Sequence, residues 1–329
     1  MKKHISIFAF FLLALIILPF ISISMGRFYI PLNNVMSALT GMSDDMVINK
    51  IIFNLRLPRI LTSILVGASL SCAGTAYQGV FKNPLVSPDL LGVSAGACVG
   101  AAISILLGLD YGYTILISFI TGILCVGLTM TFTLCIKRKS NLILLLSGII
   151  VGRFMDSILG GLKYFADSES QLGDIVYWQM GSVARVTMQR LQFIAPIIFI
   201  GLFMMFALRW RINLLAVGER DAQSLGVNII IERSAVILFS TLLTAASVSI
   251  SGSIGWLGLI IPHITRWTIG TDNKNTIPLS MLFGALFLLI VDTLARTLTP
   301  LELPLGVLIG IIGTPIFAIV LIKQREKTI

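Results

Sequence analysis

The chain has 329 residues, of which 56% are hydrophobic and only 12% are charged. Soluble globular proteins carry about 25% charged residues, so this composition excludes a soluble enzyme and a disordered chain. The formal net charge of +9 is not interpreted as a nucleic-acid-binding surface, because in a membrane protein positive charge usually marks loops that face the cytoplasm. At about 20 apolar residues per span, there is room for about ten transmembrane helices and for no large soluble domain.

Ten apolar segments are predicted to span the membrane. The first follows a basic start, but no small-residue cleavage site comes after it, so it is predicted to be a retained helix and not a signal peptide. The eighth is short and contains a proline, which makes its boundaries the least certain. An even number of spans places both termini on one side of the membrane. The predicted spans are residues 5–25, 58–80, 90–108, 112–136, 142–162, 190–208, 233–251, 254–270, 277–297 and 303–322.

Lysine and arginine are distributed unequally between the loops on the two sides. With the N-terminus inside, thirteen of them lie in inside loops and five in outside loops, which favours cytoplasmic termini. The longest inside segment, residues 209–232, is predicted to contain a short surface helix between Gly218 and Gly226. The inside residues are Lys2, Lys3, Lys82, Lys137, Arg138, Lys139, Arg209, Arg211, Arg220, Lys274, Lys323, Arg325 and Lys327, and the outside residues are Arg27, Lys50, Arg56, Lys163 and Arg185.

Ionisable residues inside the spans need partners, because an unpaired charge in the membrane is costly. Arg153 and Asp156 lie three residues apart, and Asp292 and Arg296 lie four apart, so each pair can share one helix face and neutralise itself. A proton relay is the less favoured alternative. The two histidines and four cysteines show no metal-binding spacing, so no metal site is predicted. No P-loop or hydrolase motif occurs, and no catalytic residue is predicted.

Two short segments resemble each other at an offset of 178 residues. Residues 68–75 read ASLSCAGT and residues 246–253 read ASVSISGS, and the same offset pairs Gly92 with Gly270. In the predicted topology these segments run in opposite directions, which is typical of inverted-repeat transporters. Small residues also match by chance in apolar sequence. This match alone therefore supports a true internal repeat and a chance match about equally.

Several longer strings carry a resemblance to a known family. They are LRLPRILTSILVGASLSCAGTAYQG at 55–79, VFKNPLVSPDLLGVSAGACVG at 80–100, WQMGS at 178–182, NLLAVGERDAQSLGV at 213–227, GSIGWLGLIIPHITR at 252–266 and ELPLGVLIGIIGTPIFAIVL at 302–321. In this order and spacing, they resemble the FecCD/BtuC-type permease subunits of ABC importers for iron–siderophore complexes, haem and cobalamin. The resemblance covers nearly the whole chain.

The resemblance implies an all-α polytopic membrane protein with ten transmembrane helices. It further implies a BtuC-like inverted repeat of helices 2–5 and 7–10, within a single permease domain of residues 1–329. The chain would sit in the bacterial inner membrane with both termini in the cytoplasm. Its partners would be a second permease subunit, two cytoplasmic ATPase subunits that carry ATP and Mg, and an extracytoplasmic binding protein. No cofactor and no nucleic acid would bind to this chain.

The resemblance also assigns roles to three groups of residues. The inside segment would couple the permease to the ATPase, the outer arginines would dock acidic residues of the binding protein, and two inside loops would form a cytoplasmic gate. The walls of the pathway would come from the fifth and tenth spans, with a mostly apolar lining. The coupling residues are Gly218, Glu219, Ala222, Leu225 and Gly226, the docking residues are Arg56, Arg59 and Arg296, and the gate residues are Asn83, Leu85, Asn141 and Leu142.

The sequence therefore predicts the permease subunit of an ATP-driven importer, with an iron–siderophore complex as cargo. Haem, cobalamin and, below them, oxyanions such as molybdate are alternative cargoes. A different class, a secondary transporter driven by an ion gradient, would require Asp156 or Asp292 to act as an ion site.

Overall fold

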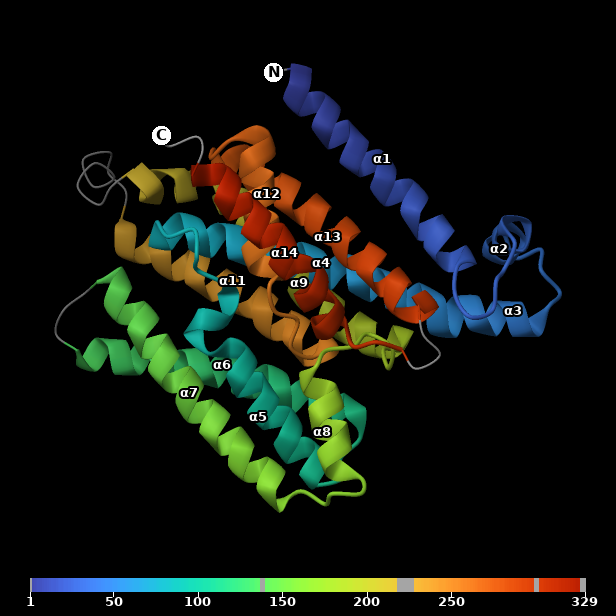
Figure 1. The fold of residues 1–329 in the computed structure, drawn as a ribbon, viewed down its shortest axis with the longest axis horizontal. Coiled ribbons are helices and arrows are strands. Elements are labelled where there is room, and N and C mark those ends of the chain that lie inside the picture. Colours follow the sequence, from blue (N-terminus) through green and yellow to red (C-terminus); the bar gives the residue numbers. More distant parts are fainter. Residues whose placement is uncertain (1, 137–139, 218–227, 299–301, 326–329) are drawn as a thin grey trace.

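The computed structural model describes residues 2–136, 140–217, 228–298 and 302–325, and these fold into helices with no strand among them (Figure 1). The all-α prediction is therefore confirmed for the described residues. The helices are α1 (Lys2–Ser24), α2 (Leu32–Leu39), α3 (Met46–Lys50), the π-helical η1 (Ile51–Arg56), α4 (Leu57–Phe81), the 3-10 helix η2 (Pro88–Leu91), α5 (Val93–Leu106), α6 (Tyr111–Cys135), α7 (Asn141–Phe165), α8 (Gln171–Gln179), α9 (Met188–Val217), α11 (Ile229–Ser251), α12 (Leu257–Ile269), α13 (Asn273–Leu298) and α14 (Leu305–Arg325).

Each of the ten predicted spans coincides with a helix. Seven helical segments of the described chain are long and apolar enough to cross a membrane. The other three predicted spans fall on α5 and α14, which are shorter apolar stretches, and on α12, which has 13 residues. The seven segments are His4–Ser24, Met46–Phe81, Tyr111–Cys135, Asn141–Phe165, Met188–Leu215, Ile229–Ser251 and Asn273–Leu298.

Two predicted boundaries are wrong, and in both places the helix is longer than expected. The sixth span was predicted to end at residue 208, but α9 continues to Val217 because Ile212 and Leu215 extend its buried apolar face. The outside stretch 26–57 was predicted to be a connection, but α3, η1 and α4 form one helical run from Met46 to Phe81. Arg56 is therefore part of a transmembrane helix.

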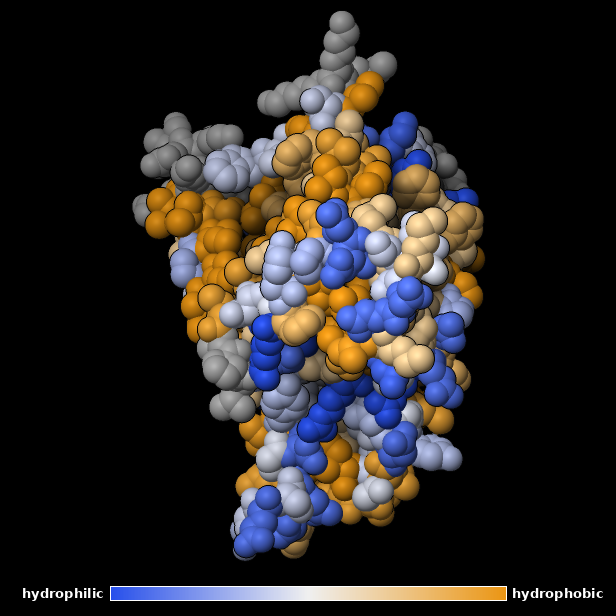
Figure 2. Space-filling view, turned by 90° about the vertical axis from the view of Figure 1, so that its right-hand side faces the viewer, coloured by the Kyte–Doolittle hydropathy of each residue, from blue (hydrophilic) through white to orange (hydrophobic). Residues whose placement is uncertain are grey.

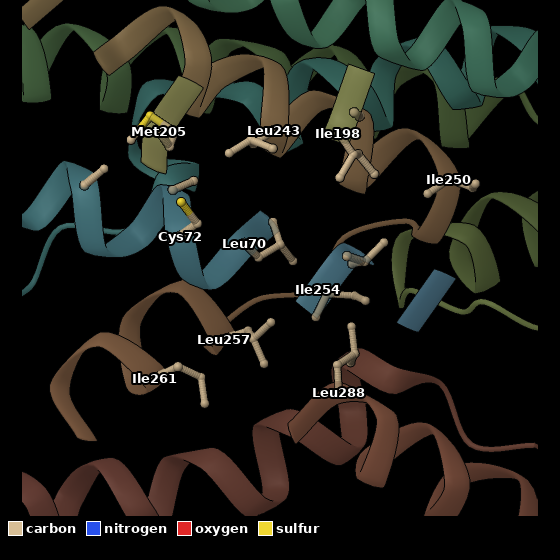
Figure 3. Close-up of a cluster of buried hydrophobic side chains, with 14 of the residues drawn as sticks. Leu70, Cys72, Ile198, Met205, Leu243, Ile250, Ile254, Leu257, Ile261 and Leu288 are labelled. Carbon is tan, nitrogen blue, oxygen red and sulfur yellow. The ribbon is translucent and has the colours of Figure 1, made fainter. Parts of the chain in front are cut away.

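Helix α4 lies at the centre of the bundle. It packs against α9, α11, α12 and α13, and nearly all of its side chains are buried. Leu70 and Cys72 of α4 point into an apolar core that also receives Met205 of α9, Leu243 of α11 and Leu288 of α13 (Figure 3). Burial of these side chains provides a continuous core across four helices.

Helices α4 and α13 approach each other closely at two glycines. A Cβ atom on Gly67 would overlap the backbone of Gly284, and a Cβ atom on Gly284 would overlap Gly67 and Ser71. Small residues allow helix backbones to meet in lipid, where association depends on packing and not on the hydrophobic effect. The many small residues of the second span therefore serve as packing positions against α13 and α12.

Two short helices begin inside the bundle. Helix α5 follows η2, whose Leu90 carbonyl lies against Gly148 in α7, and α12 begins beside Gly74 in the middle of α4. The order of a long helix, a short helix and two further helices occurs in α4–α7 and again in α11–α14, in line with the expected repeat. The pairing of Gly92 with Gly270 is wrong, because Gly92 precedes α5 whereas Gly270 follows α12.

The two ends of the bundle differ in character. Helix α1 begins at the top of Figure 1 and α14 ends at its upper left, whereas α2 and α3 lie at its right-hand end. Figure 2 looks onto this right-hand end and shows hydrophilic side chains gathered over its middle and lower part, with hydrophobic side chains above them. We call the end that carries α2, α3 and η1 the α2–α3 end.

Candidate functional site

Arg59 joins three elements at the α2–α3 end. Its Nε donates to Oδ1 of Asp292 on α13 at 2.7 Å, and its Nη1 donates to Oε2 of Glu302 at 2.7 Å. The Asp292 side chain is fully buried, whereas the Glu302 side chain is 30% exposed. Arg59 was predicted to bind an external carboxylate, and in this structure two carboxylates of the same chain occupy its guanidinium.

The other two predicted docking arginines are also buried. Arg56 donates to the carbonyls of Ile23 and Phe28, which close the turn after α1. Arg296 donates to the carbonyl of Ser22 at 2.6 Å. The three arginines therefore lie together at the α2–α3 end, but each one joins helices of this chain. Arg56 and Arg296 bind the end of α1, and Arg59 binds α13.

The pairing predicted within α13 is only part of what the structure contains. Asp292 Oδ2 lies 4.0 Å from Arg296 Nε, which is longer than the 2.7 Å contact between Asp292 and Arg59. Helical spacing indicated the Arg296 contact, but it gave no sign of Arg59, which precedes Asp292 by 233 residues. Sequence reasoning also missed Glu302, although it stands in the ELPLG string.

The four predicted gate residues lie where α4 ends and α7 begins. Asn141 donates from Nδ2 to the carbonyl of Val80 at 3.3 Å, which connects the two helices. Asn83 Oδ1 accepts a hydrogen bond from the Leu85 backbone N–H at 2.9 Å and shapes the turn after α4. The side chains of Leu85 and Leu142 are both exposed. The geometry thus places two exposed leucines and two structural asparagines at one end of the bundle.

The predicted coupling residues Gly218, Glu219, Ala222, Leu225 and Gly226 lie outside the described residues. Their flanks are described. Arg211, near the end of α9, forms an ion pair with Glu232 in the first turn of α11. The Asn213 amide donates to Asp272 Oδ1 at 2.6 Å. The segment 218–227 is therefore attached to two helices that are held together at its base.

The fifth predicted span, α7, carries a charged pair on an exposed side that also holds the apolar Ile150 and Phe154. Arg153 and Asp156 form an ion pair at 3.5 Å on its exposed face, with side chains 82% and 49% exposed. Their pairing was predicted from the spacing, but their exposure was not. Among the described residues, no group of three or more His, Cys, Asp or Glu side chains is placed to hold a metal ion.

A bundle of long apolar helices, seven of them long enough to cross a membrane, with short helices that begin inside it, indicates a multi-pass membrane protein. The chain belongs to the FecCD transport family, whose model matches residues 14–323. This confirms the family resemblance and makes the chain an ABC importer permease subunit.

Relatives and a solved structure agree with this assignment. The molybdate import system permease protein MolB of Haemophilus influenzae is 38% identical over 95% of this chain and 94% of its own length. A Helicobacter pylori protein named as a probable iron chelatin transport system permease is 38% identical over 84% of this chain and 83% of its own. Permeases named for hemin and for vitamin B12 import are further relatives.

The fold matches a metal-chelate type ABC transporter solved in an inward-facing conformation. The TM-score is 0.88 at 36% identity, and the match covers 97% of this chain and 99% of the other. The chain and this transporter therefore share the arrangement of their helices over essentially their whole length.

Proposed function

We propose that this permease subunit imports an iron chelate. The observation that carries the proposal is the fold match to a metal-chelate type ABC transporter over 97% of the chain. The relative named for iron chelatin transport supports it. Transport would follow alternating access, in which the pathway opens first toward the binding protein and then toward the cytoplasm.

The remaining components would be supplied by partners. The chain would pair with a second permease subunit in the bacterial inner membrane, with both termini in the cytoplasm. Two ATPase subunits that carry ATP and Mg would contact segment 209–232. A binding protein would dock at the α2–α3 end, where the buried Arg56, Arg59 and Arg296 gather and where an incoming carboxylate would displace the partly exposed Glu302 from Arg59. Arginine suits this role because its planar guanidinium binds carboxylates in a bidentate manner.

Molybdate is the second candidate cargo. The molybdate permease of Haemophilus influenzae matches this chain at 38% identity over 95% of its length, which is a longer match than that of the iron chelatin relative. Haem and cobalamin remain alternatives because relatives are named for both. Relatives of similar identity to this chain are named for different cargoes, so a transport measurement is needed to identify the cargo.

A secondary transporter driven by an ion gradient is less well supported. It would require a carboxylate inside the membrane that exchanges protons or ions, and Asp292 was one candidate. Asp292 is fully buried, lies 2.7 Å from Arg59 and faces Arg296 as well, so two cations already neutralise it. Asp156 also has an arginine partner.

The proposal is tested by reconstitution in liposomes. The permease is purified with its own ATPase and binding protein, and the uptake of ferric siderophores, hemin, cyanocobalamin and molybdate is compared. We expect ATP-dependent uptake of a ferric siderophore. Uptake driven by a proton gradient in the absence of the ATPase would contradict the whole assignment, and ATP-dependent uptake of molybdate alone would replace the cargo.

A further inference from the structure

A cavity of about 340 Å³ opens along the middle of α7, one of the seven segments apolar enough to cross a membrane. Its walls come from η2, α5 and α7, and Gln179 at the end of α8 and Ser253 after α11 complete them. Three charged side chains line it, namely Asp89, Arg153 and Asp156. The family resemblance places the fifth span in the pathway wall, but it assigns no role to Arg153 or to this cavity.

Glycines bring α7 close to η2 at the edge of the cavity. A Cβ atom on Gly148 would overlap the carbonyl of Leu90, and a Cβ atom on Gly152 would lie 3.7 Å from the Cα of Gly92. Helix α7 therefore packs directly on the backbone around η2. The side chains of Arg153 and Asp156 lie beside this contact and not within it, because both are exposed.

The position of Arg153 excludes contact with lipid. It stands at the midpoint of α7 (Asn141–Phe165), which is one of the seven segments apolar enough to cross a membrane. A charge at the centre of the bilayer is expensive and almost always faces a bundle interior or a water-filled cavity. The side chain of Arg153 is 82% exposed within this chain, so its surroundings must be water or another protein chain.

The exposed face of α9 provides a contrast. There the exposed residues are large and apolar, as in Phe199 and Phe203, which is typical of a lipid-facing surface. On α7, Arg153, Asp156 and Ser157 are exposed beside the apolar Ile150 and Phe154, while Val151 and Leu159 face inward. In its middle turns, α7 therefore presents charged side chains where α9 presents aromatic ones.

The three charged groups differ in how they are held. Asp89 accepts a hydrogen bond from the Ser94 hydroxyl, which fixes this carboxylate in the wall. Arg153 has one partner, Asp156, at 3.5 Å, and a guanidinium has five N–H donors. Among the three charged groups, Arg153 is thus the one with N–H donors available to a ligand.

We propose that this cavity is a cargo-contact site in the transport pathway, at which Arg153 binds anionic oxygen atoms of the cargo. The proposal rests on the proposed function. The ligand is an oxygen-rich anion, either the deprotonated oxygens of a ferric chelate or a free oxyanion. Asp156 holds the guanidinium when the site is empty, and its weak contact allows the anion to bind and then leave, which transport requires.

The first experiment measures water access and local charge without any cargo. Cys135 is exposed and the free Cys98 lines the cavity, so Cys98→Ala combined with Cys135→Ser provides the background. Ser157→Cys on α7 and the control Phe203→Cys on α9 are reconstituted with the ATPase and binding protein. Each is labelled with an anionic sulfonate and with a cationic trimethylammonium methanethiosulfonate reagent.

We expect Ser157→Cys to react with both reagents and Phe203→Cys to be nearly inert. Adding Arg153→Gln should lower the ratio of anionic to cationic labelling rates at residue 157 by roughly tenfold, because the reagents respond with opposite sign to one nearby charge. The proposal is overturned if the thiol at residue 157 is as slow as that at residue 203. It is equally overturned if the ratio does not change in Arg153→Gln.

The second experiment measures transport of ferric enterobactin, an anionic chelate, ferrichrome, a neutral chelate, and molybdate. Arg153→Gln should lower uptake of the anionic cargo at least about tenfold, while ATP hydrolysis stimulated by the binding protein remains normal. Arg185→Gln, which removes an exposed arginine paired with Asp174, is the matched control and should transport normally. Normal uptake of the anionic cargo by Arg153→Gln would refute the site.

The two experiments separate the inference from the proposed function. If the wild-type transporter moves none of the iron chelates, the proposed cargo is wrong, but the labelling ratio still decides whether the cavity is aqueous and attracts anions. If molybdate is the transported probe and depends on Arg153, the site stands and its ligand is the oxyanion.

Discussion

The Nε of Arg59 on α4 lies 2.7 Å from Oδ1 of Asp292 on α13, although 233 residues separate them in the chain. The Asp292 side chain is fully buried and that of Arg59 is 9% exposed. A buried charge without its partner is strongly destabilising, whereas the intact pair shields both charges. This pair therefore fixes the packing of the two central helices at the α2–α3 end.

Replacing Asp292 by asparagine should destabilise the protein. The substitution keeps the shape of the side chain but leaves Arg59 and Arg296 without their shared buried counter-charge, and breaking a buried pair costs about 3–5 kcal/mol. Thermal unfolding in detergent measures the effect. Asp174→Asn is the control, because its pair with Arg185 is about half exposed on both sides and such pairs contribute about 0–1 kcal/mol. Equal melting temperatures for the two variants would contradict the structural role of Asp292.

A larger residue at Gly284 should separate α4 from α13. In Gly284→Leu the new side chain would overlap the Gly67 backbone and Ser71, and overpacking in a tight core costs typically about 1–3 kcal/mol. Fluorescence size-exclusion chromatography after heating reports the loss of stability. Gly127→Ala on α6 is the control, because nothing lies within 4 Å of its added Cβ. It should be neutral or slightly stabilising, since alanine favours the helix by about 1 kcal/mol.

Hydropathy and charge located the helices well because each span must bury an apolar length set by the membrane. They located helix ends less well. Arg209 and Arg211 suggested an early end for the sixth span, but Ile212 and Leu215 keep α9 in contact with the core. Likewise, the polar residues before Arg56 suggested a loop, whereas η1 continues the helix into α4.

The site was less predictable because its contacts join distant parts of the chain. Spacing within one helix predicted the Arg153–Asp156 pair and the proximity of Asp292 to Arg296. It could not bring Arg59 to Asp292 and Glu302, since that requires α4 to lie against α13 and the segment before α14. Nor could periodicity show that the charged face of α7 is exposed while that of α13 is buried.

Glu302 should weaken docking of the binding protein by occupying Arg59. This prediction depends on the proposed docking role of the α2–α3 end. Because Glu302 is partly exposed and accepts from Nη1 of Arg59, Glu302→Gln would release a guanidinium for an incoming carboxylate. Hydrogen bonds to charged groups contribute about 1.5–3 kcal/mol, so we expect binding to tighten roughly tenfold at low salt. Surface plasmon resonance with the purified binding protein measures this affinity.

The control for Glu302 is the same substitution at Glu169. This glutamate is exposed in the connection between α7 and α8, and no ion pair is recorded for it among the described residues. Glu169→Gln should leave the affinity unchanged within about twofold. The gain in Glu302→Gln should shrink at high ionic strength, because exposed charges are screened. Unchanged or weaker binding by Glu302→Gln at low salt would remove Arg59 from the docking surface.

Gly226→Val should uncouple ATP hydrolysis from transport. Gly226 lies outside the described residues, and the prediction rests on its position in the NLLAVGERDAQSLGV string, which the family resemblance assigns to ATPase contact. Valine loses backbone conformations open to glycine and is stiff at χ1, so a short helix bounded by this residue should no longer fit its partner. Membrane insertion should be normal, because the ion pair of Arg211 with Glu232 still joins α9 to α11 at the base of the segment. Uptake in proteoliposomes should fall at least about tenfold.

The control is Gly173→Val, which changes an exposed glycine in α8 with nothing within 4 Å of an added Cβ and should transport normally. Normal uptake together with normal ATPase stimulation in Gly226→Val would show that segment 209–232 is not the coupling element.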